Sequence, residues 1–175
     1  MFQDIKAQGC DQIACLGDIV GYGQEPKQCL DLVRSMGIPS VKGNFEEYAA
    51  AEDSLEGFNP VAAENMTWLR AQLTDDDRQW MRELPYVLVL SGFSLVHATL
   101  DQPQRWGYVF DKMAAAANFE TQATPVAFFG HTHVPLAFNP RAQHRPLSAC
   151  DNAGPGCEGI PATSAGRQGV EAGLA

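Results

Sequence analysis

The segment Val126-Ala-Phe-Phe-Gly-His-Thr-His133 joins an apolar run of strand length to two histidines. Four apolar residues bounded by a glycine are typical of a short buried strand. Gly130 suits a position where the chain turns sharply or approaches a ligand closely. His131 and His133 are therefore candidate metal ligands at the end of a strand. A second interpretation is that they merely share one face of an extended segment, as residues i and i+2 do.

Three other apolar segments are also followed at once by a residue that can bind metal. The segments are Ile13–Gly17, Ser40–Gly43 and Phe93–Val96, and the residues that follow are Asp18, Asn44 and His97. In an open α/β sheet, sites form outside the carboxyl ends of the strands. If these strands are parallel neighbours, they bring all five polar groups to one edge of the sheet.

One carboxylate, one amide oxygen and three imidazoles make a mixed nitrogen and oxygen set that suits two divalent transition metal ions, of Mn, Fe, Zn or Ni. Asp18 has two oxygens and could bridge the two ions. Each residue alone has a simpler interpretation: Asp18 as a turn residue or helix cap, Gly43-Asn44 as a turn, and His97 as a core histidine. Their common placement at strand ends favours the metal site.

The rest of residues 1–140 alternates between strand and helix patterns, which predicts an α/β domain with helices covering a sheet. We expect strands at 12–16, 38–41, 86–90, 93–96 and 126–129. We expect helices ending near residue 9, over 26–36, from Pro60, from Asp75 and over 111–119. Asn59-Pro60 and Thr74 with three aspartates are typical helix starts.

Composition excludes several classes of function. The net charge of −9 argues against a general nucleic-acid binder, but not against a phosphate ester, because bound metal ions can reverse the local field. No apolar run reaches membrane-spanning length and the N-terminus does not read as a signal peptide. Five irregularly spaced cysteines indicate reduced thiols in a cytoplasmic protein. Residues 141–175 contain no aromatic residue and are predicted to be a disordered tail.

Two nucleotide-binding motifs can be set aside. Gly21-Tyr-Gly23 follows a predicted strand, but Pro26 occupies the third glycine position of a dinucleotide fingerprint. A P-loop is absent from the sequence, since no glycine is followed by lysine and then serine or threonine.

Four short motifs resemble, in the right order, those of the calcineurin-like metallophosphoesterases, most closely the small bacterial phosphodiesterase-like branch. They are Gly17-Asp-Ile-Val-Gly-Tyr-Gly23, Gly43-Asn44, Val96-His-Ala98 and Gly130-His-Thr-His-Val-Pro135. The likeness covers residues 1 to about 138. It implies a β-sandwich flanked by helices, in an αββα arrangement. It also implies that Asp18 bridges two metals, that Asn44, His97 and His131 complete one site, and that His133 belongs to the other.

The sequence departs from that family in three places. An Asp-x-His motif, which would end a first strand and supply the remaining ligands of one metal, does not precede Gly17-Asp18. We therefore expect an incomplete domain that lacks the first strand, has one weakened metal site and is low in stability. Phe45 stands where the family has a histidine that contacts the phosphate and acts as a general acid. The usual Asn-Pro-Gly-Ser segment does not follow the last motif.

These features predict a metal-dependent phosphoesterase whose hydrolysis of phosphate mono- or diesters is impaired. Its partner would be a small phosphate ester or a phosphoprotein, and neither a membrane nor nucleic acid in general; the oligomeric state stays open. The alternative is a non-catalytic metal-binding or interaction remnant of that fold. A structural α/β domain without metal is a third, weaker hypothesis.

Overall fold

A computed structural model describes residues 2–140. The expected tail, 141–175, lies outside the described residues. The elements are α1 (Phe2–Ala7), α2 (Pro26–Ser35), α3 (Asn44–Ala50), α4 (Pro60–Gln72), α5 (Asp75–Glu83), β1 (Val87–Leu90), β2 (Phe93–Val96), the 3₁₀ helix η1 (Pro103–Arg105), α6 (Lys112–Thr121) and β3 (Val126–Phe129). This mixture confirms the α/β class. Among the described residues, no helix is both long and apolar enough to span a membrane.

The three strands form one sheet in the order β1-β2-β3. β1 and β2 form an antiparallel hairpin that turns at Ser91-Gly92, where Gly92 has a φ of 92°. β2 and β3 pair in parallel, with Val96 opposite Phe129. The chain crosses from β2 to β3 through η1 and α6, and the backbone N–H of Leu100 donates to Asn118 of α6. Two parallel strands therefore end side by side, as the metal-site hypothesis requires.

Two extended segments pack on one face of this sheet. They pair only at an isolated parallel bridge between Cys15 and Ser40. Leu16 and Val41, which follow the bridge, are buried against Leu95 of β2 and against apolar side chains of β1 and β3. This packing directs the residues that follow, at positions 17–18 and 43–44, toward the end of β2.

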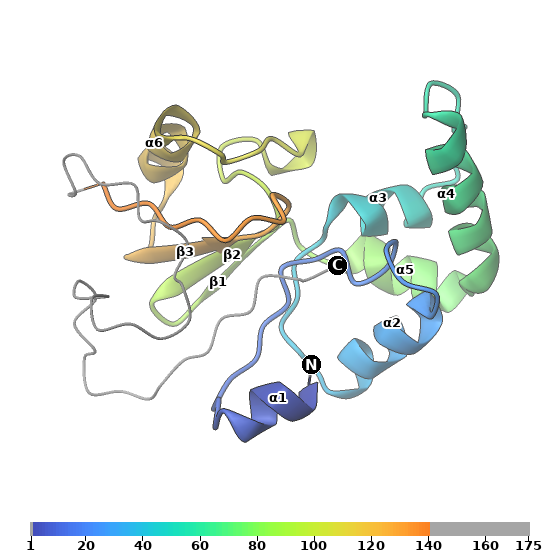
Figure 1. The fold of residues 1–175 in the computed structure, drawn as a ribbon, viewed down its shortest axis with the longest axis horizontal. Helices are drawn as coiled ribbons and strands as arrows, with labels where there is room; N and C mark the ends of the chain where they lie inside the picture. Colours follow the sequence, from blue (N-terminus) through green and yellow to red (C-terminus); the bar gives the residue numbers. More distant parts are fainter. Residues whose placement is uncertain (1, 141–175) are drawn as a thin grey trace.

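The helices α2 to α5 form a second region on the other side of these segments (Figure 1). Its core consists of buried residues from the loop before α2 and from all four helices: Val20, Leu30, Ala49, Ala50, Met66, Leu69, Leu73 and Met81. Sequence explains where the helices begin. The Asn59 side chain accepts from the N–H of Val61, and Thr74 and Asp77 cap each other's backbone N–H groups. The helical region thus supports the extended segments from the side opposite the sheet.

The structure corrects two details. The strands predicted at 12–16 and 38–41 are reduced to the Cys15–Ser40 bridge, so that within residues 2–140 one three-stranded sheet faces two extended segments. Asn44 begins helix α3, which the sequence analysis did not predict. The remaining predicted strands and helices match the observed ones to within about two residues.

Candidate metal centre

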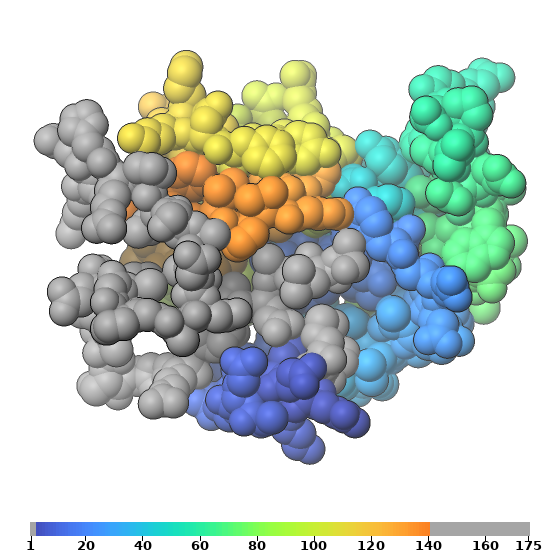
Figure 2. Space-filling view, viewed as in Figure 1, coloured from blue at the N-terminus to red at the C-terminus, as the bar shows by residue number. Residues whose placement is uncertain are grey.

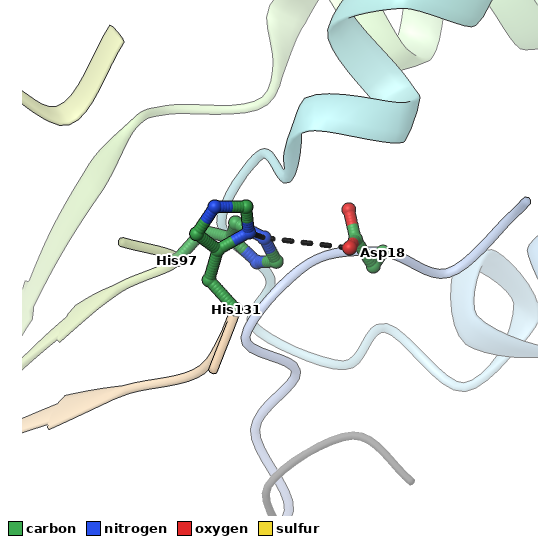
Figure 3. A group of neighbouring side chains, drawn as sticks. All are labelled: Asp18, His97 and His131. Carbon is green, nitrogen blue, oxygen red and sulfur yellow. Dashed lines mark hydrogen bonds and ion pairs between the residues drawn. The ribbon is translucent and has the colours of Figure 1, made fainter. Parts of the chain in front are cut away.

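Three candidate ligands converge at the point where β2 and β3 end. His97 directly follows β2, His131 comes two residues after β3, and Asp18 lies on the loop that follows the Cys15–Ser40 bridge. One ligand atom from each residue lies within 4.8 Å of the others. Figure 3 shows the two imidazoles and the carboxylate pointing toward one another from three separate segments. The parallel pairing of β2 and β3 is what places the two histidines together.

Hydrogen bonds fix which nitrogen of each histidine faces the centre. His97 Nδ1 lies 2.6 Å from the carbonyl oxygen of Leu16, and His131 Nε2 lies 3.0 Å from that of Trp106. Since a carbonyl only accepts, both nitrogens must carry the proton. In the neutral rings, His97 Nε2 and His131 Nδ1 are then left as lone-pair acceptors, 3.1 Å apart. Such carbonyl-oriented imidazoles are typical of metal ligands.

Both rings are neutral near pH 7. Burial lowers the pKa of His97 to about 4, and burial with the neighbouring His97 lowers the pKa of His131 to about 4. No proton is therefore available to join the two facing nitrogens. A cation between them would satisfy both lone pairs.

Asp18 adds an unsatisfied oxygen to the same space. Its Oδ1 accepts from the N–H of Phe45 at 3.2 Å, whereas its buried Oδ2 has no hydrogen-bond partner and lies 3.4 Å from His97 Nε2. Burial raises the pKa of Asp18 to about 6, so the carboxylate is largely ionised at neutral pH. A buried charged oxygen without a partner is costly, and a bound cation removes that cost.

Asn44 contributes a fourth acceptor. Its Oδ1 lies 3.2 Å from His97 Nε2, which is already an acceptor. Amide and carboxylate oxygens with two imidazole nitrogens form a donor set that suits Mn, Fe, Zn or Ni. The residues present therefore fit one divalent transition metal ion.

The loop bearing Asp18 is held by Glu46 of α3, a residue that the sequence analysis did not assign to the site. Its fully buried carboxylate accepts four backbone N–H bonds at 2.7–3.2 Å, from Asp18, Ile19, Val20 and Gly43. Burial and the nearby Asp18 charge raise the pKa of Glu46 to about 7, and the N–H donors oppose this rise. The signal was present: Glu46 is the third residue after Gly43, as in a capping box.

Two glycines let the loops approach each other. A Cβ atom on Gly43 would lie 2.3 Å from Asp18 Oδ1, and one on Gly17 would lie 2.5 Å from the backbone nitrogen of Gly43. Gly17 also has a φ of 89°, which favours glycine. Asp18, His131 and His133 themselves have φ values of 52°, 64° and 53°, a conformation uncommon for such residues and frequent at functional sites.

His133 and Phe45 lie beside the cluster of Asp18, His97 and His131, and both rings contact Tyr22. The Tyr22 ring is 4.9 Å from the His133 ring and 4.7 Å from the Phe45 ring, both in edge-on contact. Phe45 also lies over Gly21, where a Cβ would come within 2.2 Å of the phenyl ring. His133 is outside the cluster formed by Asp18, His97 and His131.

Aromatic residues from the segment before α6 complete the surroundings. Tyr108 stacks on His131 with ring centroids 4.2 Å apart, and Trp106 contacts His97 at 5.9 Å in addition to holding His131 through its carbonyl. Sequence reasoning gave neither Trp106 nor Tyr108 a role in the site. Because both residues are distant from every histidine along the chain, no sequence pattern indicated their place beside the site.

Known proteins share this sequence and architecture. The chain is 31% identical over 141 residues to an uncharacterised protein of Methanocaldococcus jannaschii. The match covers 78% of this chain and 56% of that protein. The structure of this chain resembles that of a metallophosphoesterase from Sphaerobacter thermophilus, with 36% identity and a TM-score of 0.66. The match covers 77% of this chain and 56% of that chain. This chain also has the fold of a hypothetical protein from Pyrococcus horikoshii, with 15% identity and a TM-score of 0.63. That match covers 77% of this chain and 62% of the other. The chain thus spans little more than half the length of these relatives.

The calcineurin-like phosphoesterase superfamily domain matches residues 1–157, which is most of the chain. That match confirms the resemblance seen in the four sequence motifs. The same motifs supply Asp18, His97 and His131, whose ligand atoms converge in the structure. The family uses divalent metal ions, and the donor set described above suits such an ion. The chain belongs to the calcineurin-like phosphoesterase superfamily.

Proposed function

We propose that this chain is a metal-dependent phosphoesterase domain that binds a divalent transition metal ion of Mn, Fe, Zn or Ni and acts on a phosphate mono- or diester. Asp18, His97, His131 and Asn44 would hold the ion. The observation that carries the proposal is the meeting of four acceptor atoms, one of them the partnerless Asp18 Oδ2, with no proton donor among them.

A second, weaker metal site would lie on the His133 side of Asp18. The Asp18 carboxylate has two oxygens, and although burial raises its pKa, His133 is close enough to oppose part of that rise. Within residues 2–140, these are the two groups assigned to that site. We therefore expect the second ion to bind more weakly than the first.

When bound, the metal would polarise a phosphoryl oxygen and make a hydroxide available near neutral pH. The protein's residues contribute orientation: Glu46 fixes the Asp18 loop, and the Leu16 and Trp106 carbonyls fix the imidazoles. Phe45 cannot donate a proton to a leaving group. Because a positioned general acid contributes about 10²–10⁴-fold in rate, we expect slow turnover.

Metal content and hydrolysis test the proposal together. Elemental analysis of the protein after incubation with Mn²⁺ or Zn²⁺ and desalting should give about one ion per chain, and Asp18→Asn should lose it. Asp31→Asn is the matched control, because Asp31 is an exposed carboxylate of α2 paired with Lys27. Bis(p-nitrophenyl) phosphate then reports activity. Absence of metal from the wild-type protein after reconstitution would rule the proposal out.

A non-catalytic metal-binding module is the second candidate. The Phe45 ring, packed on Gly21 and Tyr22 where a proton donor is expected, favours it. Stoichiometric metal uptake without any hydrolysis of the aryl diester, in the wild type and in Phe45→His, would support this second candidate over the first.

A further inference from the structure

Two half-exposed tyrosines flank the candidate metal centre from different segments. Tyr22, in the loop before α2, is 54% exposed, and Tyr108, in the segment before α6, is 52% exposed. Each contacts a histidine of the last motif: Tyr108 stacks on His131 at an interplanar angle of 16°, and Tyr22 meets His133 edge-on. Figure 2 shows, on one face of the molecule, the orange segment lying against a yellow segment and a blue segment.

The stacked rings continue outward from the metal centre. Phe110 stacks on Tyr108 with centroids 5.1 Å apart and planes 12° apart, and it is 52% exposed. The row His131, Tyr108, Phe110 therefore leads from a candidate ligand to solvent. Tyr108 alone would suffice to hold the His131 ring in place. That simpler role leaves the exposed rings of Phe110 and Tyr22 unexplained.

We infer that Tyr22, Tyr108 and Phe110 form a subsite for a planar aromatic group carried by the substrate. The substrate class is then a phosphate ester with an aryl or nucleobase group, its phosphate at the metal centre and its ring against these side chains. Aromatic rings attract one another beyond the contribution of the apolar area that they bury. The inference rests on the proposed function, because the phosphate must bind at the same centre.

The Phe45 ring is consistent with this class when the aromatic group is the leaving group. In hydrolysis, a water oxygen forms a new bond to phosphorus, the P–O bond to the aryl oxygen breaks, that oxygen leaves with the electron pair, and the water proton passes to solvent. A phenolate is a far weaker base than an alkoxide and leaves without protonation. A site without a proton donor at position 45 therefore favours aryl over alkyl esters.

Binding calorimetry on the Mn²⁺-loaded full chain tests the inference without requiring turnover. Phenyl phosphate is compared with methyl phosphate, and uridine 5′-monophosphate with ribose 5-phosphate. The wild type should bind the aromatic member of at least one pair about threefold to tenfold more tightly, the range that ring contacts of this kind give. Tyr108→Leu and Tyr22→Leu should each reduce that ratio. Trp68→Leu, on an exposed tryptophan of α4, should keep it.

The outcomes distinguish failure of the aromatic subsite from failure of the proposed function. A preference for phenyl phosphate alone identifies a simple aryl ester, and a preference that extends to the uridine nucleotide identifies a nucleobase. Equal binding within both pairs overturns the aromatic subsite while leaving the phosphoesterase proposal intact. A preference that survives both tyrosine substitutions also overturns it. Failure of all four ligands to bind the metal-loaded chain overturns the proposed function and the inference together.

Discussion

Substitution of Glu46 by Gln removes one of the two oxygens that hold the Asp18 loop while keeping the size of the side chain. In the wild type, one carboxylate oxygen accepts from the N–H groups of Ile19 and Val20, and the other accepts from those of Asp18 and Gly43. A glutamine offers one oxygen and one NH₂ group. In either orientation, the NH₂ group faces two N–H donors that have lost their acceptor.

The cost follows from counting those groups. Each buried donor left without an acceptor costs about 1–3 kcal/mol, so two cost about 2–6 kcal/mol. Burial raises the pKa of Glu46 to about 7, which shows that the charge itself is costly to bury, and the uncharged amide avoids part of this cost. We expect a net loss of about 2–4 kcal/mol in the free energy of unfolding.

Urea unfolding of the metal-free protein, followed by circular dichroism in the presence of a chelator, measures this loss without any contribution from metal. Glu64→Gln is the matched control, because Glu64 is an exposed carboxylate of helix α4. A Glu46→Gln protein within about 0.5 kcal/mol of the wild type, the range of ordinary surface changes, would refute the argument that these four bonds hold the loop.

Other consequences can be checked on the same protein. Phe45→His should raise hydrolysis of an alkyl ester such as glycerol 2-phosphate by about 10²-fold or more if the imidazole acts as a general acid, and an unchanged rate would contradict that role. Gly43→Ala should lose metal binding and stability together, since its Cβ would lie 2.3 Å from Asp18 Oδ1; elemental analysis and thermal unfolding measure the two losses. Mn²⁺ at 100 times its dissociation constant should stabilise the wild type by about 2.7 kcal/mol and Asp18→Asn by much less, as thermal unfolding would show. Burial would raise the pKa of Asp77, but Thr74 and Lys27 bind its charged form and lower it overall. Asp77 therefore stabilises the fold above the pKa of an unfolded aspartate, and the advantage of the wild type over Asp77→Asn in urea unfolding should shrink as the pH falls below about 4.

Helices with an explicit capping residue were predicted well from sequence. Asn59 before Pro60, Thr74 before three aspartates and Asp111 before α6 all cap the helices that follow them. The hairpin of β1 and β2 is equally local, because both predicted strands flank the turn at Ser91-Gly92. In each case, the residues that decide the element lie within a few positions of its end.

Elements that depend on distant partners were predicted less well. The segments at 12–16 and 38–41 have the composition of strands, but they pair with each other only at Cys15 and Ser40. Helix α3 was missed because Gly43-Asn44 was interpreted as the end of a strand, whereas Glu46 bonds back to Gly43 and across to the Asp18 loop. The capping box of Gly43 and Glu46 is a local signal that was not used, whereas pairing across 25 to 28 residues leaves no local pattern.

In the candidate site, too, residues in local motifs were predicted and contacts between distant segments were not. The sequence analysis proposed Asp18, Asn44, His97, His131 and His133. The structure brings Asp18, His97 and His131 together and places Asn44 Oδ1 3.2 Å from His97 Nε2. Their roles as ligands remain predictions. The Leu16 and Trp106 carbonyls that orient the imidazoles act through the backbone, so no side-chain pattern could indicate them.

The pairing of β2 with β3 links correct folding to metal uptake. Val96 lies opposite Phe129, and the N–H of Gly130 donates to the carbonyl of His97 at 2.9 Å, so both histidines leave the sheet at one level. A slip of one residue would move His131 by about 3.3 Å and turn alternate side chains to the other face. A chain with β3 misaligned could not gain the stability that metal confers. The ion would thus stabilise the correctly paired chain but not chains with β3 out of register. It would do so only after the slow pairing of β2 with β3 across the α6 crossover.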